Sequence, residues 1–237
     1  MDAKRWVIFG VIVVAVIGGM VYMSSGNRMD LEDIGKDGSM AMLGAEERNG
    51  NIADHVRGSE EPKVLIVEYG DFQCPGCRTY SAEVNSIVSQ NSEHVGLVYR
   101  HFPLSQMHPN ARAAAAAAEA AGLQGKFWEM HDLLFENQTE WSSTQPTSRN
   151  ELFVTYARQL ALDEDQFLEK LGDTQITQKI NFDVALGRLA EVTGTPAFYV
   201  QGEYVQISND NPTALEDAVN EALIEAGVEV EATEEDN

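Results

Sequence analysis

The sequence predicts an α/β fold for its central part, from two strand patterns and the helical pattern between them. Residues 64–69 form an apolar, β-branched run that is typical of a buried strand, and Gly70 and Asp71 after it are turn signals. A helical pattern follows directly, and residues 95–100 form the second strand candidate. Because a strand, a crossover helix and a second strand favour parallel pairing, these segments indicate an α/β sheet.

The start of the chain predicts a membrane anchor. Lys4 and Arg5 precede a run over residues 6–23 that carries no charged residue. A helix of this length would measure about 27 Å, just enough to cross the hydrocarbon core of a bilayer. A cleaved signal peptide is the alternative, but the run is long for one and Tyr22-Met23-Ser24-Ser25 is a poor cleavage site. The basic residues before the run favour a cytoplasmic N-terminus, with the remainder of the chain outside the cytoplasm.

Composition limits the domain organisation and the partners. The chain has 237 residues, 43% of them hydrophobic, which suffices for one core plus the anchor. Its 38 acidic and 16 basic residues give a formal net charge of −22, so nucleic acid is excluded as a partner because its phosphates would be repelled. Residues 24–60 lack any sustained period and predict a flexible acidic linker, and residues 229–237 predict a solvated acidic tail. Residues 61–228 remain for the folded domain.

The only two cysteines lie in Cys74-Pro75-Gly76-Cys77, where the first strand gives way to the helix. Apolar residues recur at helical spacing from Cys77 onward, so Cys77 is expected on the buried side of the helix. Cys74 comes at the helix start, where free N–H groups and the helix dipole stabilise a thiolate, and Pro75 suits the first helical position. We therefore expect Cys74 to be the nucleophile and Cys77 to be the thiol beneath it that attacks a mixed disulfide.

Three other interpretations of the cysteine pair are disfavoured. A structural disulfide across two residues would close a very small loop and would stabilise little. A zinc site would need a second pair of ligands, and the five histidines show no ligand spacing. Two buried, inert thiols disagree with a position at the helix start. The motif therefore favours dithiol chemistry, without a metal or another cofactor.

Residues 107–192 predict mainly helices. An alanine-rich helix is expected over residues 111–121, and further segments with apolar residues at helical spacing follow it. His131 lies on one of these apolar faces and is expected to be a core histidine rather than a ligand. Ser148 and Glu151 have the spacing of a capping box and predict a helix start at that point.

The chain returns to strands after this helical part. Residues 197–200 and 203–207 predict two strands, and the tight turn Gln201-Gly202 between them indicates an antiparallel hairpin. A last helix is expected to begin at Pro212 and to end at Gly227.

Five motifs between residue 53 and the last helix match the sequence pattern of one known protein family. They are Ala53-Asp54-His55-Val56-Arg57-Gly58, Val67-Glu68-Tyr69-Gly70-Asp71-Phe72-Gln73-Cys74-Pro75-Gly76-Cys77, Arg100-His101-Phe102-Pro103-Leu104, Gln124-Gly125-Lys126-Phe127-Trp128 and Gly194-Thr195-Pro196. Together they resemble DsbA-like thiol–disulfide oxidoreductases of the thioredoxin superfamily, especially the membrane-anchored bacterial type. The resemblance implies a thioredoxin-like fold with a helical insertion at about residues 107–192, preceded here by one N-terminal transmembrane helix.

The resemblance also assigns roles to residues outside the cysteine pair. Thr195-Pro196 matches the cis-proline loop, which faces the cysteines and, with Pro75 and Gly76, contacts the client. Glu68 matches a buried acid that helps proton transfer to or from the resolving thiol, and burial would raise its pKa. From residue types alone, Pro196 would be a trans proline at an edge strand and Glu68 a carboxylate at a strand end.

The function that the resemblance implies is donation of a disulfide to reduced secreted or membrane client proteins outside the cytoplasm. A DsbB-like or vitamin K epoxide reductase-like membrane partner would then reoxidise the dithiol. Gly76 stands where the best-known DsbA motif has a histidine, so we expect a moderate oxidant. The linker offers no separate dimerisation domain, which favours a monomer. A reductase of the same fold and a non-catalytic binding domain with a structural disulfide remain as alternatives.

Overall fold

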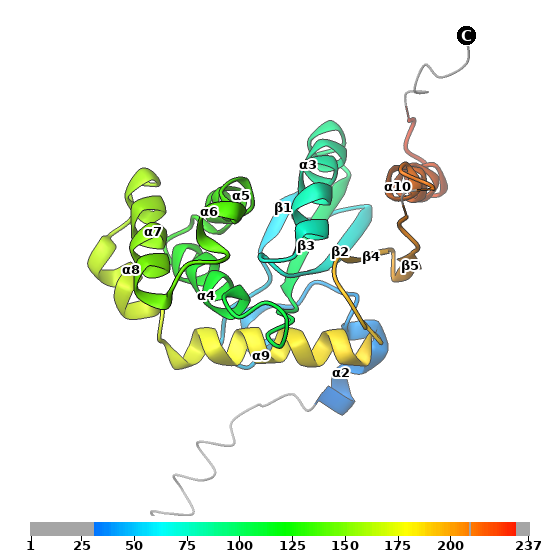
Figure 1. Cartoon of the computed structure of the whole chain (residues 1–237). Helices are drawn as coiled ribbons and strands as arrows, with labels where there is room; N and C mark the ends of the chain where they lie inside the picture. Colours follow the sequence, from blue (N-terminus) through cyan, green and yellow to red (C-terminus); the bar gives the residue numbers. More distant parts are fainter. Residues whose placement is uncertain (1–30, 209, 231–237) are drawn as a thin grey trace, which may run out of the picture.

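A five-stranded mixed sheet lies at the centre of the computed structural model, which describes residues 31–208 and 210–230 (Figure 1). The strand order is β1-β3-β2-β4-β5. The strands are β1 (Val56–Gly58), β2 (Val64–Gly70), β3 (Val95–His101), β4 (Ala197–Val200) and β5 (Glu203–Val205). β2 and β3 pair in parallel, and the other neighbours pair antiparallel. The parallel pairing predicted for the first two strands is therefore confirmed.

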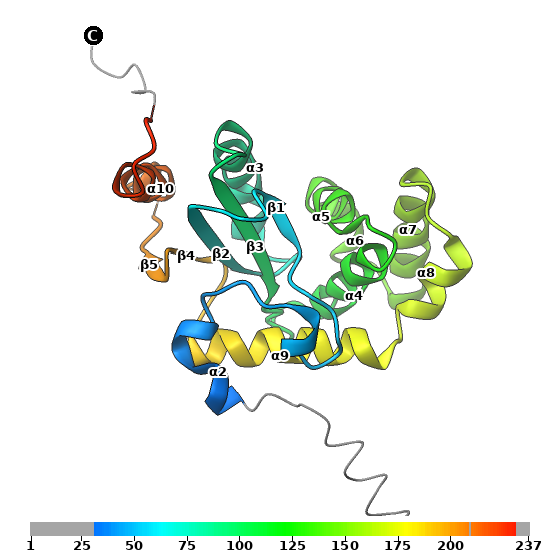
Figure 2. The same ribbon diagram turned by 180° about the vertical axis from the view of Figure 1, so that it is seen from behind.

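Helices cover both faces of the sheet and extend beyond one of its edges (Figures 1 and 2). In the described residues they are α2 (Leu31–Gly38), the short 3₁₀ helix η1 (Ala45–Glu47), α3 (Pro75–Gln90), α4 (Ala111–Gly122), α5 (Phe127–Glu136), α6 (Gln138–Trp141), α7 (Pro146–Gln159), α8 (Glu164–Lys170), α9 (Thr174–Leu189) and α10 (Ala214–Glu225). α4 to α8, the first part of the helical insertion expected over about residues 107–192, lie beside the β1 edge, and α10 packs against β2, β4 and β5.

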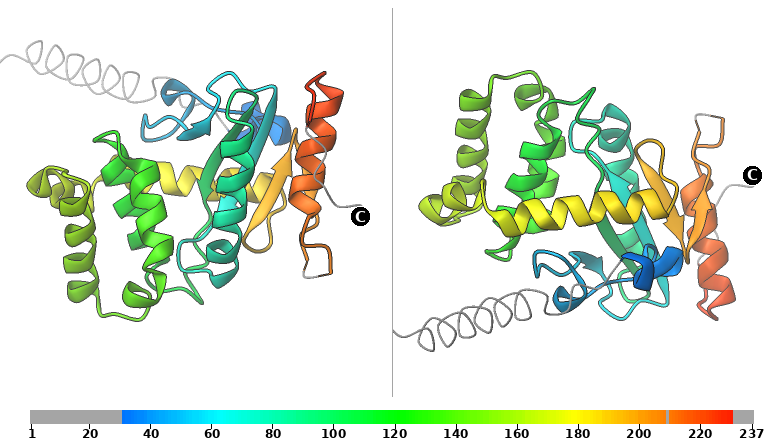
Figure 3. Two further views of the ribbon diagram at one scale, coloured as in Figure 1. Left: turned by 90° about the horizontal axis from the view of Figure 1, so that it is seen from above. Right: turned by 90° about the horizontal axis from the view of Figure 1, so that it is seen from below.

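The two faces of β2 and β3 differ because successive side chains point to opposite sides. Ile66 and Leu97 belong to the core cluster that α3 and α10 cover, whereas Val67 and Val98 belong to the cluster that α9 covers. Figure 3 shows α9 running from the insertion to the sheet, so that this single helix joins the two parts. With both faces covered, both strands are mainly apolar in sequence, and their polar residues Glu68, Arg100 and His101 are buried.

The structure confirms the predicted hairpin but not the predicted capping box. The hairpin is confirmed: Gln201 (φ 50°) and Gly202 (φ 86°) form the tight turn between β4 and β5. The Ser148 and Glu151 capping box is wrong, because α7 begins at Pro146 with Gln145 as its N-cap. A proline is already close to helical φ and needs no N–H partner in the first turn, so the helix starts earlier than the box predicts.

The predicted linker at residues 24–60 differs from the structure in its later part. Ile34, Met40, Leu43 and Ile52 are buried, and the first three pack in the cluster that α9 covers. These apolar residues follow no helical or strand period, so the sequence pattern does not reveal that they are part of a core. The folded domain therefore includes the chain from about Ile34 onward.

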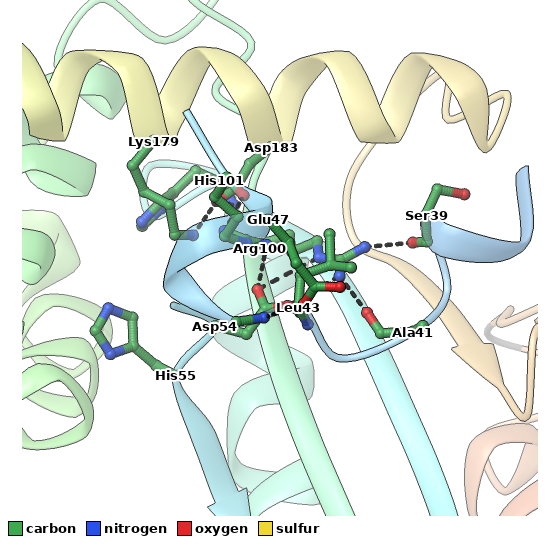
Figure 4. A network of polar contacts seen from close by, with 12 residues as sticks. Ser39, Ala41, Leu43, Glu47, Asp54, His55, Arg100, His101, Lys179 and Asp183 are labelled. Atoms are coloured by element: carbon green, nitrogen blue, oxygen red, sulfur yellow. Dashed lines mark hydrogen bonds and ion pairs between the residues drawn. The ribbon is translucent and has the colours of Figure 1, made fainter. Parts of the chain in front are cut away.

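Buried ion pairs fix this early segment against the sheet and α9 (Figure 4). Arg48 Nη1 lies 2.9 Å from Asp183 Oδ1, and Arg100 Nη2 lies 2.9 Å from Asp54 Oδ2. Arg48 also pairs with Asp54, and Lys179 Nζ lies 2.7 Å from Asp183 Oδ2. The side chains of Arg48, Arg100, Lys179 and Asp183 are fully buried. Each of these buried charges has a partner of opposite charge. Moving the segment away would leave charges buried without a partner, so the network holds the segment in one position.

No helix within residues 31–208 and 210–230 is long and apolar enough to cross a membrane. The anchor predicted at residues 6–23 and most of the acidic tail lie outside the described residues.

Candidate active site

The cysteine motif forms the first turn of α3. Cys74 is the N-cap residue, with extended backbone (φ −73°, ψ 123°), and Pro75 occupies the first helical position. Cys77 is completely buried, whereas Cys74 retains 9% of its surface accessible to solvent. Both cysteines are free thiols in this structure. The structure confirms the positions at the helix start and the burial of Cys77, but Cys74, which the sequence analysis expects to be reachable by solvent, is also largely buried, because the Thr195-Pro196 loop lies beside its sulfur.

The surroundings of Cys74 stabilise its thiolate. A hydrogen bond from the Cys77 thiol is the largest influence, and the pKa of Cys74 falls to about 5 although its partial burial acts in the opposite direction. The N–H groups of Cys77 and Gly76 add to the stabilisation. Cys74 is therefore ionised at neutral pH, as expected for a nucleophile at a helix start.

The surroundings of Cys77 disfavour its thiolate. Burial raises its pKa well above that of a free cysteine, and the neighbouring Cys74 and Glu68 raise it further. The backbone N–H of Asp71 donates to Cys77 Sγ at 3.4 Å, which only partly offsets this effect. The pair therefore consists of one thiolate near the surface and one thiol beneath it.

Glu68 lies on the same face of the sheet as Tyr99, its partner residue in β3, and its side chain is buried. Burial raises the pKa of Glu68 to about 8, with a further contribution from the Cys74 charge and an opposing one from Arg57. Glu68 Oε1 has no hydrogen-bond partner in the part of the chain that the structure describes. The expected rise in the pKa is confirmed, and a carboxyl group that titrates near pH 8 can exchange a proton close to neutral pH.

The Thr195-Pro196 peptide bond is cis and borders the cysteines, as the resemblance implies. Cys74 Sγ lies 3.3 Å from the carbonyl oxygen of Thr195, to which its thiol form donates. A Cβ atom at Gly76 would lie only 3.2 Å from Cδ of Pro196, so glycine at this position lets the proline ring pack closely against the motif. The structure thus brings all seven predicted site residues to one place: Glu68, Cys74, Pro75, Gly76, Cys77, Thr195 and Pro196.

Asp71 and His108 form a part of the site that the sequence analysis missed. The Asp71 side chain is completely buried, and its Oδ2 lies 2.7 Å from His108 Nδ1 and accepts from the N–H of Leu104 at 2.8 Å. Its Oδ1 accepts from the N–H of Gln73 at 2.7 Å. Asp71 thus ties the turn before Cys74 to the loop after β3. The one signal in the sequence is that Asp71 lies three residues before Cys74, and this position by itself indicates only a turn.

Gln138 supports the same turn from α6. Its Nε2 donates to the carbonyl oxygens of Phe72 and Cys74, at 2.8 and 2.9 Å. The helical insertion therefore holds the backbone on both sides of Gln73 and helps to fix the nucleophile.

A second group of charged residues lies away from the cysteines. His101, Glu119 and Asp183 bring ligand atoms within 4.8 Å of one another, as a metal site would. The ammonium group of Lys179 lies among them, 2.7 Å from Asp183 and 3.6 Å from Glu119. Although burial alone would raise the pKa of Glu119, its electrostatic interactions with His55 and Lys179 and its hydrogen bonds with His101 and His55 hold that pKa well below its usual range. Lys179 therefore supplies the positive charge that a metal ion would bring.

Comparison with known proteins agrees with this fold. A family model described as thioredoxin matches residues 50–221. A thioredoxin-like oxidoreductase from Silicibacter pomeroyi DSS-3 is 30% identical in sequence, with a TM-score of 0.58 over 71% of this chain and 91% of that one. BdbD from Bacillus subtilis superposes with a TM-score of 0.62 over 78% of this chain and 97% of that one, at 20% identity, which shows the shared fold.

Curated relatives match a shorter part. The Na(+)/H(+) antiporter NhaA 1 from Salinispora arenicola is 45% identical over 149 residues, which are 63% of this chain and 22% of the antiporter. The chain thus spans about a fifth of the length of this relative. Solved structures with the same fold include a thiol–disulfide exchange protein, α-DsbA2 from Wolbachia pipientis, with a TM-score of 0.59 at 21% identity over 71% of this chain and 86% of that one. Since the family model covers most of the sequence and the cysteine pair lies at the start of α3, this chain belongs to the thioredoxin family.

Proposed function

We propose that this protein is a thiol–disulfide oxidoreductase that donates the Cys74–Cys77 disulfide to client proteins with free thiols. The observation that carries the proposal is the difference between the two cysteines: Cys74 has a pKa of about 5, whereas the pKa of Cys77 is raised well above that of a free thiol. A stabilised Cys74 thiolate lowers the free energy of the reduced protein. The disulfide is then more easily reduced, which makes it a better oxidant of client thiols.

The reaction takes place in two exchange steps. A client thiolate attacks Sγ of Cys74, the Cys74–Cys77 bond breaks, and Cys77 leaves as a thiolate that takes a proton. Glu68 is the donor of that proton, because it is buried beside the pair and has a pKa of about 8. A second client thiolate then attacks the client sulfur of the mixed disulfide, and Cys74 leaves as the stabilised thiolate. The client loses two electrons and gains one disulfide.

Client binding is assigned to the surface around Cys74. Pro75, Gly76, Thr195 and Pro196 border the sulfur that the client must reach. The Thr195 carbonyl oxygen lies next to Cys74 and accepts hydrogen bonds, so an extended client backbone could donate to this loop beside the reacting sulfur.

The cellular setting belongs to the same proposal. The uncharged run at residues 6–23 supports a single-pass membrane protein whose domain lies outside the cytoplasm, where disulfides persist. Each catalytic cycle leaves a dithiol that must lose two electrons before the next cycle. A DsbB-like or vitamin K epoxide reductase-like membrane protein would accept them, and a monomeric domain suffices for this chemistry.

Two alternatives predict different reactions. A reductase of the same fold would reduce client disulfides faster than it oxidises client thiols. A binding domain would hold clients without exchanging sulfur bonds, although the lowered pKa of Cys74 argues against an inert pair.

The test is to mix the oxidised full-length protein with a reduced, unfolded client and to follow disulfide formation in the client by mass spectrometry. We expect one client disulfide for each protein disulfide consumed. Cys77→Ser has no disulfide to donate, so it is mixed instead with the disulfide form of the client; its Cys74 thiolate should attack that disulfide, release one client thiolate and accumulate as a mixed disulfide, whereas Cys74→Ser should form none. Binding without any mixed disulfide would support the binding domain, and faster reduction of an insulin-like substrate would support the reductase.

A further inference from the structure

A histidine for which the exchange steps above have no role contacts Asp71, in the turn before Cys74. His108 Nδ1 is 2.7 Å from Oδ2 of the completely buried Asp71, and the His108 side chain is 18% exposed. A buried carboxylate that holds one nitrogen of a partly exposed imidazole is the arrangement by which enzymes orient a catalytic base.

The hydrogen bonds decide which nitrogen of His108 carries a proton. Asp71 accepts from the backbone N–H groups of Gln73 and Leu104, so its carboxylate acts as an acceptor. The contact with His108 Nδ1 therefore needs a proton on that nitrogen. In the neutral imidazole, Nε2 is then the free acceptor, and Nε2 forms no hydrogen bond with any residue that the structure describes.

His108 lines a groove whose walls include the residues on either side of Cys74. The groove has a volume of about 550 Å³ and is lined by Gln73, Pro75, Arg78, Thr79, His108, Gln138, Thr139 and Ser142. Gln73 and Pro75 are the residues directly before and after Cys74. A client segment that reaches Cys74 from this side therefore passes His108.

The charges around the groove favour the thiolate form of a client cysteine. Among the described residues that line it, Arg78 of α3 is the one with a permanent charge, and Asp71 lies behind His108. The α6 side contributes the uncharged Gln138 and Thr139. A thiolate that forms in the groove would meet a positive guanidinium and no carboxylate from these lining residues.

From this arrangement we infer that His108 is the general base for the client: its Nε2 removes the proton of the client thiol as that thiol attacks Cys74. This inference rests on the proposed function. The client S–H bond breaks and Nε2 gains the proton, while the new sulfur–sulfur bond to Cys74 forms and Cys77 leaves as a thiolate. Asp71 is the positioning residue that fixes the imidazole. His108 releases the proton to solvent after the step.

The pKa of the client thiol limits how much His108 can accelerate its attack on Cys74. A cysteine thiol with an ordinary pKa of about 8.5 is about 3% ionised at pH 7, so complete activation can accelerate its attack by at most about 30-fold. A thiol that is already ionised at pH 7 gains nothing from a base. The benefit of His108 should also disappear as the pH rises above the pKa of the client thiol.

The experiment compares wild type with His108→Asn in the oxidised full-length protein. The asparagine amide can replace the Nδ1 donor to Asp71 but cannot accept a proton. His94→Asn is the matched control, because His94 is a partly exposed histidine on the loop before β3. Single-turnover rates are measured from pH 6 to pH 10 with a cysteine peptide and with an aromatic thiol that is ionised at pH 7. Alkylation of Cys74 in the reduced proteins monitors the nucleophile itself.

We expect His108→Asn to slow the cysteine peptide by between about 3-fold and 30-fold at pH 7, the upper limit being set by the ionised fraction of the thiol. The rates of wild type and His108→Asn with the cysteine peptide should become equal near pH 10. The substitution should change neither the rate with the aromatic thiol nor the rate of Cys74 alkylation. An unchanged peptide rate at pH 7, or equal losses with both thiols, would overturn the role as a base. If wild type oxidises neither thiol, the proposed function itself fails.

Discussion

Replacing Glu68 by glutamine should change how the stability of this protein depends on pH. Glu68 has a pKa of about 8 in the folded protein and an ordinary value of 4.5 in a flexible chain. Between these values the folded state binds one more proton than the unfolded state, so the free energy of unfolding decreases as the pH rises. The decrease begins near pH 4.5 and ends above pH 8. The glutamine amide of the variant does not titrate, so this contribution to the slope is absent.

The magnitude follows from the displacement of the pKa. Each unit corresponds to about 1.4 kcal/mol, and integration from pH 5 to pH 7.5 gives a loss of about 3 kcal/mol for the wild type. Because Glu68 is completely buried, solvent screening requires no large reduction of this value. Reduced Cys74, with its lowered pKa, produces a slope of opposite sign above pH 5, so the measurement uses the oxidised protein. Without the Cys74 charge the pKa of Glu68 is raised somewhat less, and we expect about 2 to 3 kcal/mol.

The assay is denaturant unfolding of oxidised wild type, Glu68→Gln and the control Glu151→Gln, whose carboxylate is exposed on α7. Wild type and the control should each lose about 2 to 3 kcal/mol more than Glu68→Gln between pH 5 and pH 7.5. Parallel curves for wild type and Glu68→Gln would refute the raised pKa and, with it, the role of Glu68 as proton donor to Cys77.

Three further predictions concern the nucleophile, the buried charges and the anchor. At pH 6 iodoacetamide should modify Cys74 of the reduced protein and leave Cys77 free, as peptide mass spectrometry can establish; faster modification of Cys77 would reverse their roles. Asp54→Asn leaves two buried arginines without full partners and should lower the free energy of unfolding by about 3 to 5 kcal/mol in denaturant titrations, whereas a loss below about 1 kcal/mol would show that the network does not hold the early segment. The protein isolated from membranes should retain residues 6–23 in its intact mass, and a mature form that begins near Ser25 would disprove the anchor.

Local patterns were sufficient for the elements that carry the cysteines. A mainly apolar run predicts β2, and the spacing after Cys77 predicts the buried face of α3. A strand that is buried on both faces needs apolar residues at most positions, and a helix that is buried on one face needs them at helical spacing. The cis bond at Thr195-Pro196 could not be derived in this way. It was expected only from the resemblance to DsbA-like proteins, and the structure has it.

The contacts that the sequence analysis missed join residues far apart in the chain. Asp71 and His108 are 37 positions apart, and Arg48 and Asp183 are 135 positions apart. Neither helical nor strand periodicity relates such positions, since only the assembled fold brings them together. For the same reason the sequence predicts a linker for the segment after Ile34, although Arg48 and Asp54 of this segment form ion pairs inside the domain.

The equilibrium of the full-length protein with a glutathione redox buffer gives the reduction potential of the Cys74–Cys77 pair. Stabilisation of the Cys74 thiolate predicts a disulfide donor of moderate strength, with a potential between about −200 and −120 mV, the range from protein disulfide isomerase and the glutaredoxins to DsbA. A potential near that of thioredoxin, about −270 mV, would contradict this conclusion and would make the protein a reductase.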